Sequence, residues 1–140
     1  MPEPTPVDRA AQALRHRDLS RFELDGRLAK AGVDDDARAD AMETLARLGY
    51  VDDDRFATGR AEALAGRGYG DAAIALELGG RGVPAETIAA AIAALEPERE
   101  RAQTLAARLG RSPRTAARLA RKGFSAESLE PIVAAGPDVP

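Results

Sequence analysis

Basic side chains concentrate in one stretch of an otherwise acidic chain. Residues 99–122 contain eight lysines and arginines and a single acid, Glu100, whereas the 140-residue chain carries a net charge of −3. Guanidinium and ammonium groups bind phosphates and carboxylates through charge-assisted hydrogen bonds. The chemistry that this stretch predicts is recognition of an anionic partner.

Four arginines of the stretch recur at helical spacing, and a lysine follows the last of them. They are Arg111, Arg114, Arg118, Arg121 and Lys122. With about 100° of rotation per residue the four arginines span an arc of roughly 80°, and Ala116, Leu119 and Ala120 face away from it. Such a stripe can simply solvate an exposed helix. On an acidic chain we favour a contact with phosphates or with an acidic protein groove.

The sequence shows no catalytic or metal-binding constellation. It lacks cysteine, which excludes disulfides, thiolate catalysis and zinc sites built on sulfur. It also lacks a phosphate-binding glycine loop and a nucleophile elbow, and its one histidine, His16, lies among charged residues. The run Asp52 to Asp54 could suggest a metal site, but its place before Phe56 favours a helix start. We expect neither an enzyme nor a cofactor or metal ion.

Four aromatic side chains could either pack in the core or offer stacking surfaces for bases. We expect Phe56 and Phe124 to pack in the core. Tyr50 and Tyr69 are amphipathic, and the sequence leaves open whether they pack or offer stacking surfaces for bases.

Helices must position these groups. The chain has 31 alanines, only five phenylalanines or tyrosines, and no β-branched run. Alanine is the strongest helix former, so this composition predicts an all-α fold with thin buried seams.

A leucine followed four residues later by a glycine, and then by an apolar residue, occurs three times. The glycines are Gly32, Gly82 and Gly123, and each precedes a capping-type residue at plus two and an acid at plus four. The pattern indicates a helix that ends on a left-handed glycine, a turn, and a second helix that begins on a cap. Three such units predict three tandem three-helix repeats in an elongated, curved array of right-handed type.

We place one all-α domain at residues 7–135, with repeats at about 7–48, 49–95 and 97–135 and disordered tails at 1–6 and 136–140. No apolar stretch approaches the roughly 18 residues of a membrane span, and the first residues lack the pattern of a secretory signal. The expectation is a cytoplasmic protein. The modest apolar content gives no reason to expect a dimer, so we expect a monomer.

The middle of the chain carries a recognisable set of motifs. Residues 48–57 read LGYVDDDRFA, residues 67–70 read RGYG, and the next helix runs to RGV at 81–83. This segment of about 40 residues resembles the central repeat of the RecX family, bacterial regulatory proteins of tandem three-helix repeats that bind the RecA recombinase. The flanking repeats agree with the family in length and phase over about 7–135.

The resemblance implies a noncovalent modulator of DNA repair and the SOS response. Such proteins lie in the deep groove of the RecA filament, bridge neighbouring protomers, and hinder strand exchange and ATP turnover. In this chain we expect the basic stripe at Arg111, Arg114, Arg118, Arg121 and Lys122 to be the electrostatic patch for such a partner, and it could also meet single-stranded DNA. We also expect a second contact at Arg67, Tyr69 and Arg81.

One departure from the family pattern weakens part of this assignment. The family usually places basic residues on both sides of the isoleucine in the helix after the Gly-Tyr-Gly turn, whereas this chain has Ala73 and Ala75 there. Two other functions also stay open. Short helices joined by glycine turns can form a stand-alone DNA-binding regulator, and the array could serve as a scaffold for another protein.

Overall fold

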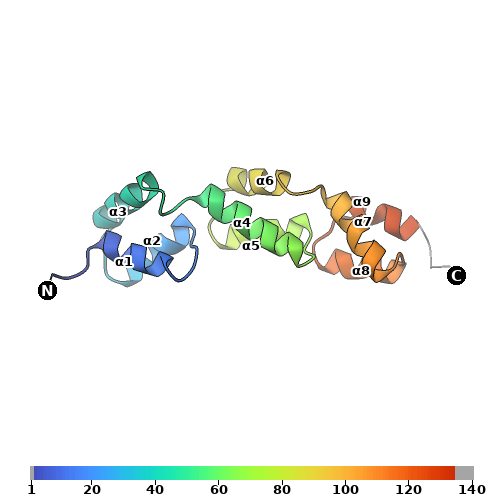
Figure 1. Cartoon of the computed structure of the whole chain (residues 1–140), viewed down its shortest axis with the longest axis horizontal. Helices are drawn as coiled ribbons and strands as arrows, with labels where there is room; N and C mark the ends of the chain where they lie inside the picture. The colour runs from blue at the N-terminus through green and yellow to red at the C-terminus, as the bar shows by residue number, and fades with distance from the viewer. Residues whose placement is uncertain (1, 135–140) are drawn as a thin grey trace.

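The chain folds as an extended row of three helical repeats (Figure 1). A computed structural model describes residues 2–134, in which there are nine helices. Repeat 1 contains α1 (Pro6–Leu14), α2 (Arg21–Lys30) and α3 (Asp35–Arg47). Repeat 2 contains α4 (Asp53–Gly66), α5 (Asp71–Gly80) and α6 (Ala85–Ala93). Repeat 3 contains α7 (Glu98–Leu109), α8 (Pro113–Arg121) and α9 (Ala126–Ala134).

The predicted all-α fold of three three-helix repeats is confirmed, and the curvature and handedness of the array stay predictions. At the amino end Thr5 caps α1 and Pro6 is its first residue, so the helix begins one residue earlier than expected. The tail expected at 136–140 lies outside the described residues. None of the helices in residues 2–134 combines the length and the apolarity needed to cross a lipid bilayer.

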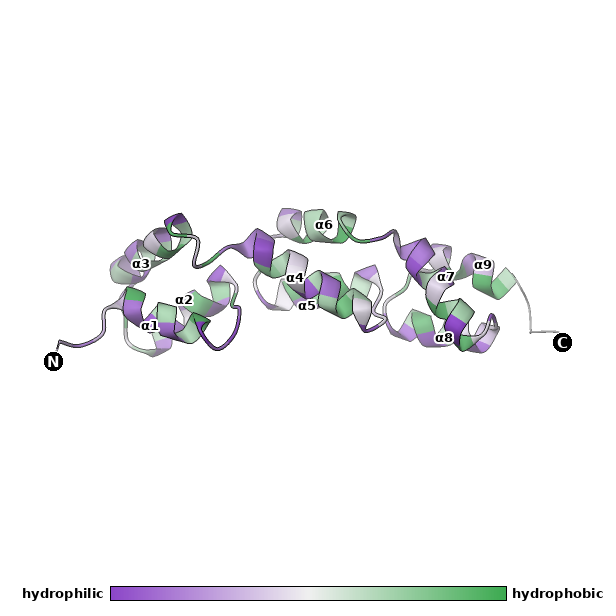
Figure 2. Ribbon diagram, in the orientation of Figure 1, coloured by the Kyte–Doolittle hydropathy of each residue, from purple (hydrophilic) through white to green (hydrophobic). Residues whose placement is uncertain are grey.

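Each repeat has a buried core of its own. The largest buried side chains are Leu24 and Leu45 in repeat 1, Ile74 and Leu78 in repeat 2, and Leu119 and Ile132 in repeat 3. Helices pack mainly against helices of their own repeat. Figure 2 shows hydrophilic starts to α4 and α7, the first helices of repeats 2 and 3. The repeats are therefore joined through polar surfaces rather than through a shared core.

The three turn glycines adopt the predicted left-handed conformation. Their φ angles are +86° at Gly32, +75° at Gly82 and +96° at Gly123. In each turn the amide of the next residue donates to the carbonyl of the leucine five positions earlier, at 3.1 Å. A side chain at such a φ would approach the following carbonyl, so glycine is the residue that ends these helices without strain.

The predicted helix starts are also confirmed. Ser20 and Glu23 form a reciprocal capping box at α2, and the Ser112 side chain caps α8. The acidic run begins α4, where the Asp52 side chain accepts a hydrogen bond from the Arg55 amide. These caps fix where each helix starts and thus which residues face the neighbouring repeat.

Candidate partner-binding surface and the junctions that position it

Three of the predicted arginines lie exposed on helix α8. Arg114, Arg118 and Arg121 are exposed, while Ala116 and Leu119 are buried in the core of repeat 3. The core side of α8 thus fixes the opposite side as a basic surface. For these three arginines the structure has the stripe that the spacing predicted.

The position predicted for Arg111 on this stripe is wrong. Gly110 ends α7 and Ser112 caps α8, so Arg111 lies in the turn between the two helices. It is half-buried, and its Nη1 donates to Oε1 of Gln103 at 2.5 Å. The predicted stripe extends the helical period through a cap, where the backbone leaves the helix.

Members of the two predicted contact regions meet at the boundary between repeats 2 and 3. Lys122 Nζ donates to the carbonyl oxygen of Arg67 at 2.8 Å and lies 4.3 Å from the centroid of the Tyr69 ring. Arg67 is exposed and Tyr69 is half-buried. A cation over an aromatic face is attracted by the ring quadrupole. The structure therefore brings Arg67, Tyr69 and Lys122 into one surface with α8.

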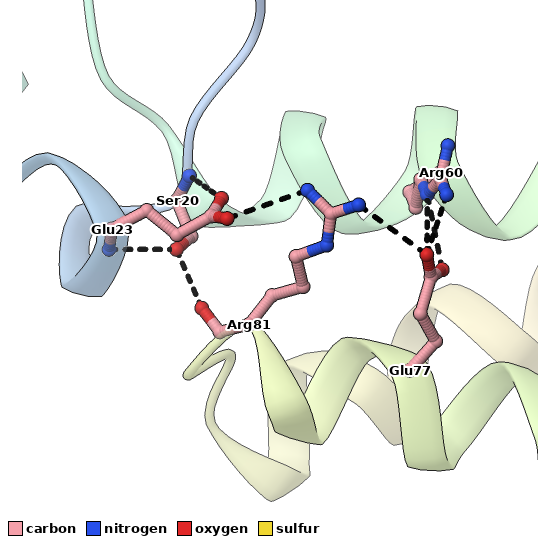
Figure 3. Close-up of polar contacts among 5 residues, drawn as sticks. All are labelled: Ser20, Glu23, Arg60, Glu77 and Arg81. Carbon is pink, nitrogen blue, oxygen red and sulfur yellow. Dashed lines mark hydrogen bonds and ion pairs between the residues drawn. The ribbon is translucent and has the colours of Figure 1, made fainter.

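Arg81 lies elsewhere, between repeats 1 and 2. Its Nη1 is 3.3 Å from Oε2 of Glu23 and its Nη2 is 3.4 Å from Oε1 of Glu77 (Figure 3). Arg60 Nε donates to the Glu77 carboxylate at 3.0 Å, and this hydrogen bond lowers the pKa of Glu77 despite partial burial. In this chain the Arg81 guanidinium connects repeats 1 and 2 and does not join Arg67 and Tyr69.

The first junction, between repeats 1 and 2, also has two contacts to backbone. Ser20 Oγ donates to the carbonyl oxygen of Arg81 at 2.6 Å. Asp53, the first residue of α4, accepts a hydrogen bond from the Arg21 amide at 2.9 Å. The start of α2 is thus held both by the end of α5 and by the start of α4.

The second junction, between repeats 2 and 3, repeats this arrangement. The Gly70 amide donates to the carbonyl oxygen of Lys122 at 2.8 Å, and the Ala72 amide donates to that of Gly123 at 3.3 Å. Glu98, the first residue of α7, accepts a hydrogen bond from the Asp71 amide at 2.7 Å. Lys122 thus takes the place of Arg81, and Glu98 takes the place of Asp53.

Glu98 also holds the start of α9, a role that the sequence analysis missed. It accepts hydrogen bonds from the amide and the hydroxyl of Ser125 at 3.0 and 2.8 Å. Burial by itself raises the pKa of Glu98, but the hydrogen bonds from Ser125, Ser128 and Asp71 together outweigh it and lower the pKa below its usual value. A carboxylate shared by two helix starts compensates both macrodipoles.

Arg101 is a second junction residue that the sequence analysis missed. It is buried, its Nη2 lies 2.9 Å from the Asp71 carboxylate and 3.3 Å from the Tyr69 carbonyl oxygen, and its Nη1 donates to the carbonyl oxygen of Glu96. Its guanidinium lies 5.8 Å from the centroid of the Phe124 ring. Arg101 therefore ties the turn that carries Tyr69 to repeat 3.

The alanine at position 73 has a structural consequence at the second junction. Ala73 precedes the buried Ile74, as Glu23 precedes the buried Leu24, so Ala73 stands where the first junction has its carboxylate. Among the residues that the structure describes, Lys122 thus has no counterpart of the Glu23 carboxylate that faces Arg81. Its ammonium contacts a carbonyl oxygen and a ring instead.

The four aromatic side chains differ in burial, with the two phenylalanines in the core and the two tyrosines nearer the surface. Phe56 and Phe124 are buried in the cores of repeats 2 and 3, which confirms their packing role. Tyr50 is 54% exposed beside the Gly49 turn. Tyr69 is half-buried, and Lys122 lies over its ring.

An elongated helical array with an exposed basic surface is typical of proteins that act by binding other macromolecules. A family model described as "RecX, second three-helix domain" matches residues 52–92. The regulatory protein RecX of Xanthomonas axonopodis pv. citri (strain 306) is 39% identical over 137 residues, covering 91% of this chain and 85% of that protein. The regulatory protein RecX of Stenotrophomonas maltophilia (strain R551-3) is 36% identical, covering 97% and 90%.

The crystal structure of RecX from Lactobacillus salivarius superposes with a TM-score of 0.78 at 19% identity and covers 91% of each chain, which shows the shared fold. The chain belongs to the RecX family of regulatory proteins. Proteins of this family are regulators, not enzymes.

Proposed function

We propose that this protein binds the RecA filament and inhibits its ATP hydrolysis, recombination and SOS activities. Family membership supports RecA as the partner. The observation that carries the proposal for this chain is the exposed arginine face of α8, which continues into Arg67 and Lys122 across the second junction. Because RecA acts on chromosomal DNA, the proposed place of action is the cytoplasm.

The extended row of repeats suits a partner that is itself a polymer. Repeats in a row present contact points at separate places, and linked weak contacts gain affinity because each one raises the effective concentration of the next. A row lying in the filament groove would bridge neighbouring protomers and obstruct the movements of strand exchange. The mechanism needs no covalent step.

The proposed contact surface has a direct part and a supporting part. Its direct part is formed by Arg114, Arg118, Arg121, Lys122, Arg67 and Tyr69, with Arg111 at its edge. Arg81 supports the surface by fixing repeat 1 against repeat 2. If single-stranded DNA also meets this surface, each neutralised phosphate should steepen the logarithmic salt dependence of binding by about 0.7.

Charge reversal tests the proposal. The double variant Arg114→Glu/Arg118→Glu should keep its helical circular dichroism and lose inhibition of RecA-dependent ATP hydrolysis by about tenfold, because two attractive charges become repulsive. A matched control is Arg27→Glu/Arg47→Glu, which reverses two exposed arginines of repeat 1. Inhibition that is unchanged in the α8 variant would remove this surface from the mechanism.

A titration separates the proposal from the other functions. Co-sedimentation with RecA filaments across a salt series should show binding that weakens with salt. Tight, sequence-specific binding to duplex DNA without RecA would instead favour a stand-alone DNA-binding regulator. Sedimentation velocity of the protein alone checks the expectation of a monomer.

A further inference from the structure

A hollow at the second junction combines basic walls with an apolar floor. The basic residues that line it are Arg67, Arg108, Arg118 and Lys122. The floor is formed by Leu105, Leu109 and Leu119. The hollow has a volume of about 200 Å³, and we call it the basic notch.

The charges of the basic notch are not balanced by carboxylates of the described residues. Within 2–134 the arginines that form ion pairs are Arg38, Arg60, Arg81 and Arg101, none of which lines the notch. No aspartate or glutamate is among the residues that line it. Four cations around one hollow repel each other and together favour the binding of an anion.

The floor of the basic notch restricts what that anion can be. Leu109 is 44% exposed, and Leu105 is half-buried beside it. Burying this apolar surface favours a ligand with an apolar group, at about 25 cal/mol per Å². A phosphodiester backbone would gain nothing from the leucines. Tyr69, which lies beside Lys122, is half-buried with the Lys122 ammonium over its ring, so it offers a base little open stacking surface.

We propose that the basic notch binds a short acidic peptide segment that carries one apolar side chain. The apolar side chain would rest on Leu105 and Leu109, and carboxylates on either side of it would meet Arg67, Arg108 and Lys122. This inference deepens the proposed function, on which it rests, because the notch lies within the proposed RecA-binding surface. A second copy of this chain is a poor occupant, since its acidic runs at 34–36 and 52–54 are fixed at the starts of α3 and α4.

The test uses the full chain labelled with ¹⁵N and a synthetic ten-residue peptide of glutamates with one central leucine. The Gly68 amide, at the edge of the notch, should shift and saturate, while the Gly32 amide in repeat 1 should not move. Replacing the leucine of the peptide by alanine should weaken binding about five- to tenfold, because apolar burial is lost.

Protein variants locate the binding. Arg108→Gln and Leu109→Ser change exposed side chains of the notch, and each should weaken peptide binding about five- to tenfold. The matched control is Arg99→Gln, which removes an exposed arginine of the same helix outside the notch and should leave binding unchanged.

Three results would overturn the proposal. Equal binding of the leucine and alanine peptides would show that the floor plays no part. Displacement of the peptide from Gly68 by equimolar oligo(dT) would assign the notch to nucleic acid, and a Gly68 shift that depends on protein concentration alone would assign it to a second copy.

RecA inhibition is measured separately. If the peptide does not bind but Arg114→Glu/Arg118→Glu still relieves RecA inhibition, only the proposal for the notch is refuted. If the peptide binds but the double variant leaves RecA inhibition unchanged, only the proposed RecA function is refuted.

Discussion

The two junctions between repeats use the same positions but different kinds of contact. In each, the carbonyl before a turn glycine, at Arg81 or Lys122, accepts a hydrogen bond from the preceding repeat. In each, the first residue of the following repeat's first helix, Asp53 or Glu98, has a carboxylate that accepts a hydrogen bond. The donor is the amide at the start of the second helix of the preceding repeat. The row is therefore built by one repeated connection.

The difference lies in how closely the backbones approach. At the first junction a hydroxyl, Ser20 Oγ, reaches the carbonyl. At the second, an amide of the backbone itself reaches it, and a Cβ built on Gly70 would lie 2.4 Å from the carbonyl carbon of Gly123. A junction made of side chains can adjust by rotamer changes, whereas one made of backbone cannot. The less adjustable junction is therefore the one that carries the proposed binding surface.

Alanine at the three turn glycines should give the largest effect and the sharpest test of this difference. Gly32→Ala adds a Cβ that meets nothing within 4 Å, so it should cost only the left-handed strain of about 1 kcal/mol. Gly82→Ala would place a Cβ 2.3 Å from the Phe22 side chain, which is 67% exposed, and should cost about 2 to 3 kcal/mol.

Gly123→Ala should cost the most of the three, about 4 kcal/mol, since its Cβ would lie 2.6 Å from the backbone nitrogen of Ala73. Urea unfolding followed by circular dichroism measures all three. Equal losses would mean that the two junctions do not differ in how closely their backbones approach.

Neutralising the carboxylates at the starts of α4 and α7, Asp53 and Glu98, compares the two junctions at a second position. Glu98→Gln should lower the free energy of unfolding by about 1 to 2 kcal/mol, because a half-buried carboxylate holds the starts of both α5 and α9. Asp53→Asn removes one exposed contact and should cost about 0.5 kcal/mol. Hydrogen exchange of the Asp71 and Arg21 amides reports each contact separately. Exchange at Asp71 that stays slow in Glu98→Gln would contradict the assigned role.

Salt should weaken the first junction through its ion pairs. Arg81→Gln should cost about 1 kcal/mol at 0.1 M NaCl and less at 1 M, because salt already screens the partly exposed pairs with Glu23 and Glu77. The matched control is Arg27→Gln, an exposed arginine in no ion pair of the described residues, which should cost nothing measurable. A cost for Arg81→Gln that does not change with salt would show that packing rather than charge holds this junction.

Acid should weaken both junctions over the same pH range, and this is the smallest expected effect. The pKa values of Glu77 and Glu98 are lowered in the folded chain, by the hydrogen bond from Arg60 and by those from Ser125 and Asp71. Their contribution to stability is therefore complete above the ordinary glutamate range and is lost as pH falls below about 4. Glu77→Gln and Glu98→Gln should each flatten the acid limb of unfolding free energy against pH by less than about 1 kcal/mol. Acid limbs that keep the parent slope would contradict both assignments.

Much of the fold follows from the sequence because its signals are local. The glycines at 32, 82 and 123 need a left-handed backbone, and the Ser20 and Glu23 pair forms a capping box within four residues. The placement of Arg111 failed because the helical period was extended across Ser112, which the sequence itself marks as a cap. Ser112 was thus a local signal for the start of α8, and the predicted stripe did not take it into account.

The junction residues were missed because their partners are distant in the sequence. Glu98 and Arg101 look like ordinary charged residues of an exposed first helical turn. Their common partner, Asp71, lies about 30 residues earlier in the sequence. One signal could have found Glu98. It is an acid at the first residue of the first helix of its repeat, as Asp53 is. The basic notch needs the fold, because Arg67 and Arg118 come from different repeats.

The repetition of the two junction positions has a consequence for how such a protein can change in length. A duplicated repeat would bring both its carbonyl before the turn glycine and its leading carboxylate, so it would find fitting neighbours on either side without new interactions. The molecule can therefore lengthen by one repeat at a time, while the spacing between successive contact sites on a polymeric target stays constant.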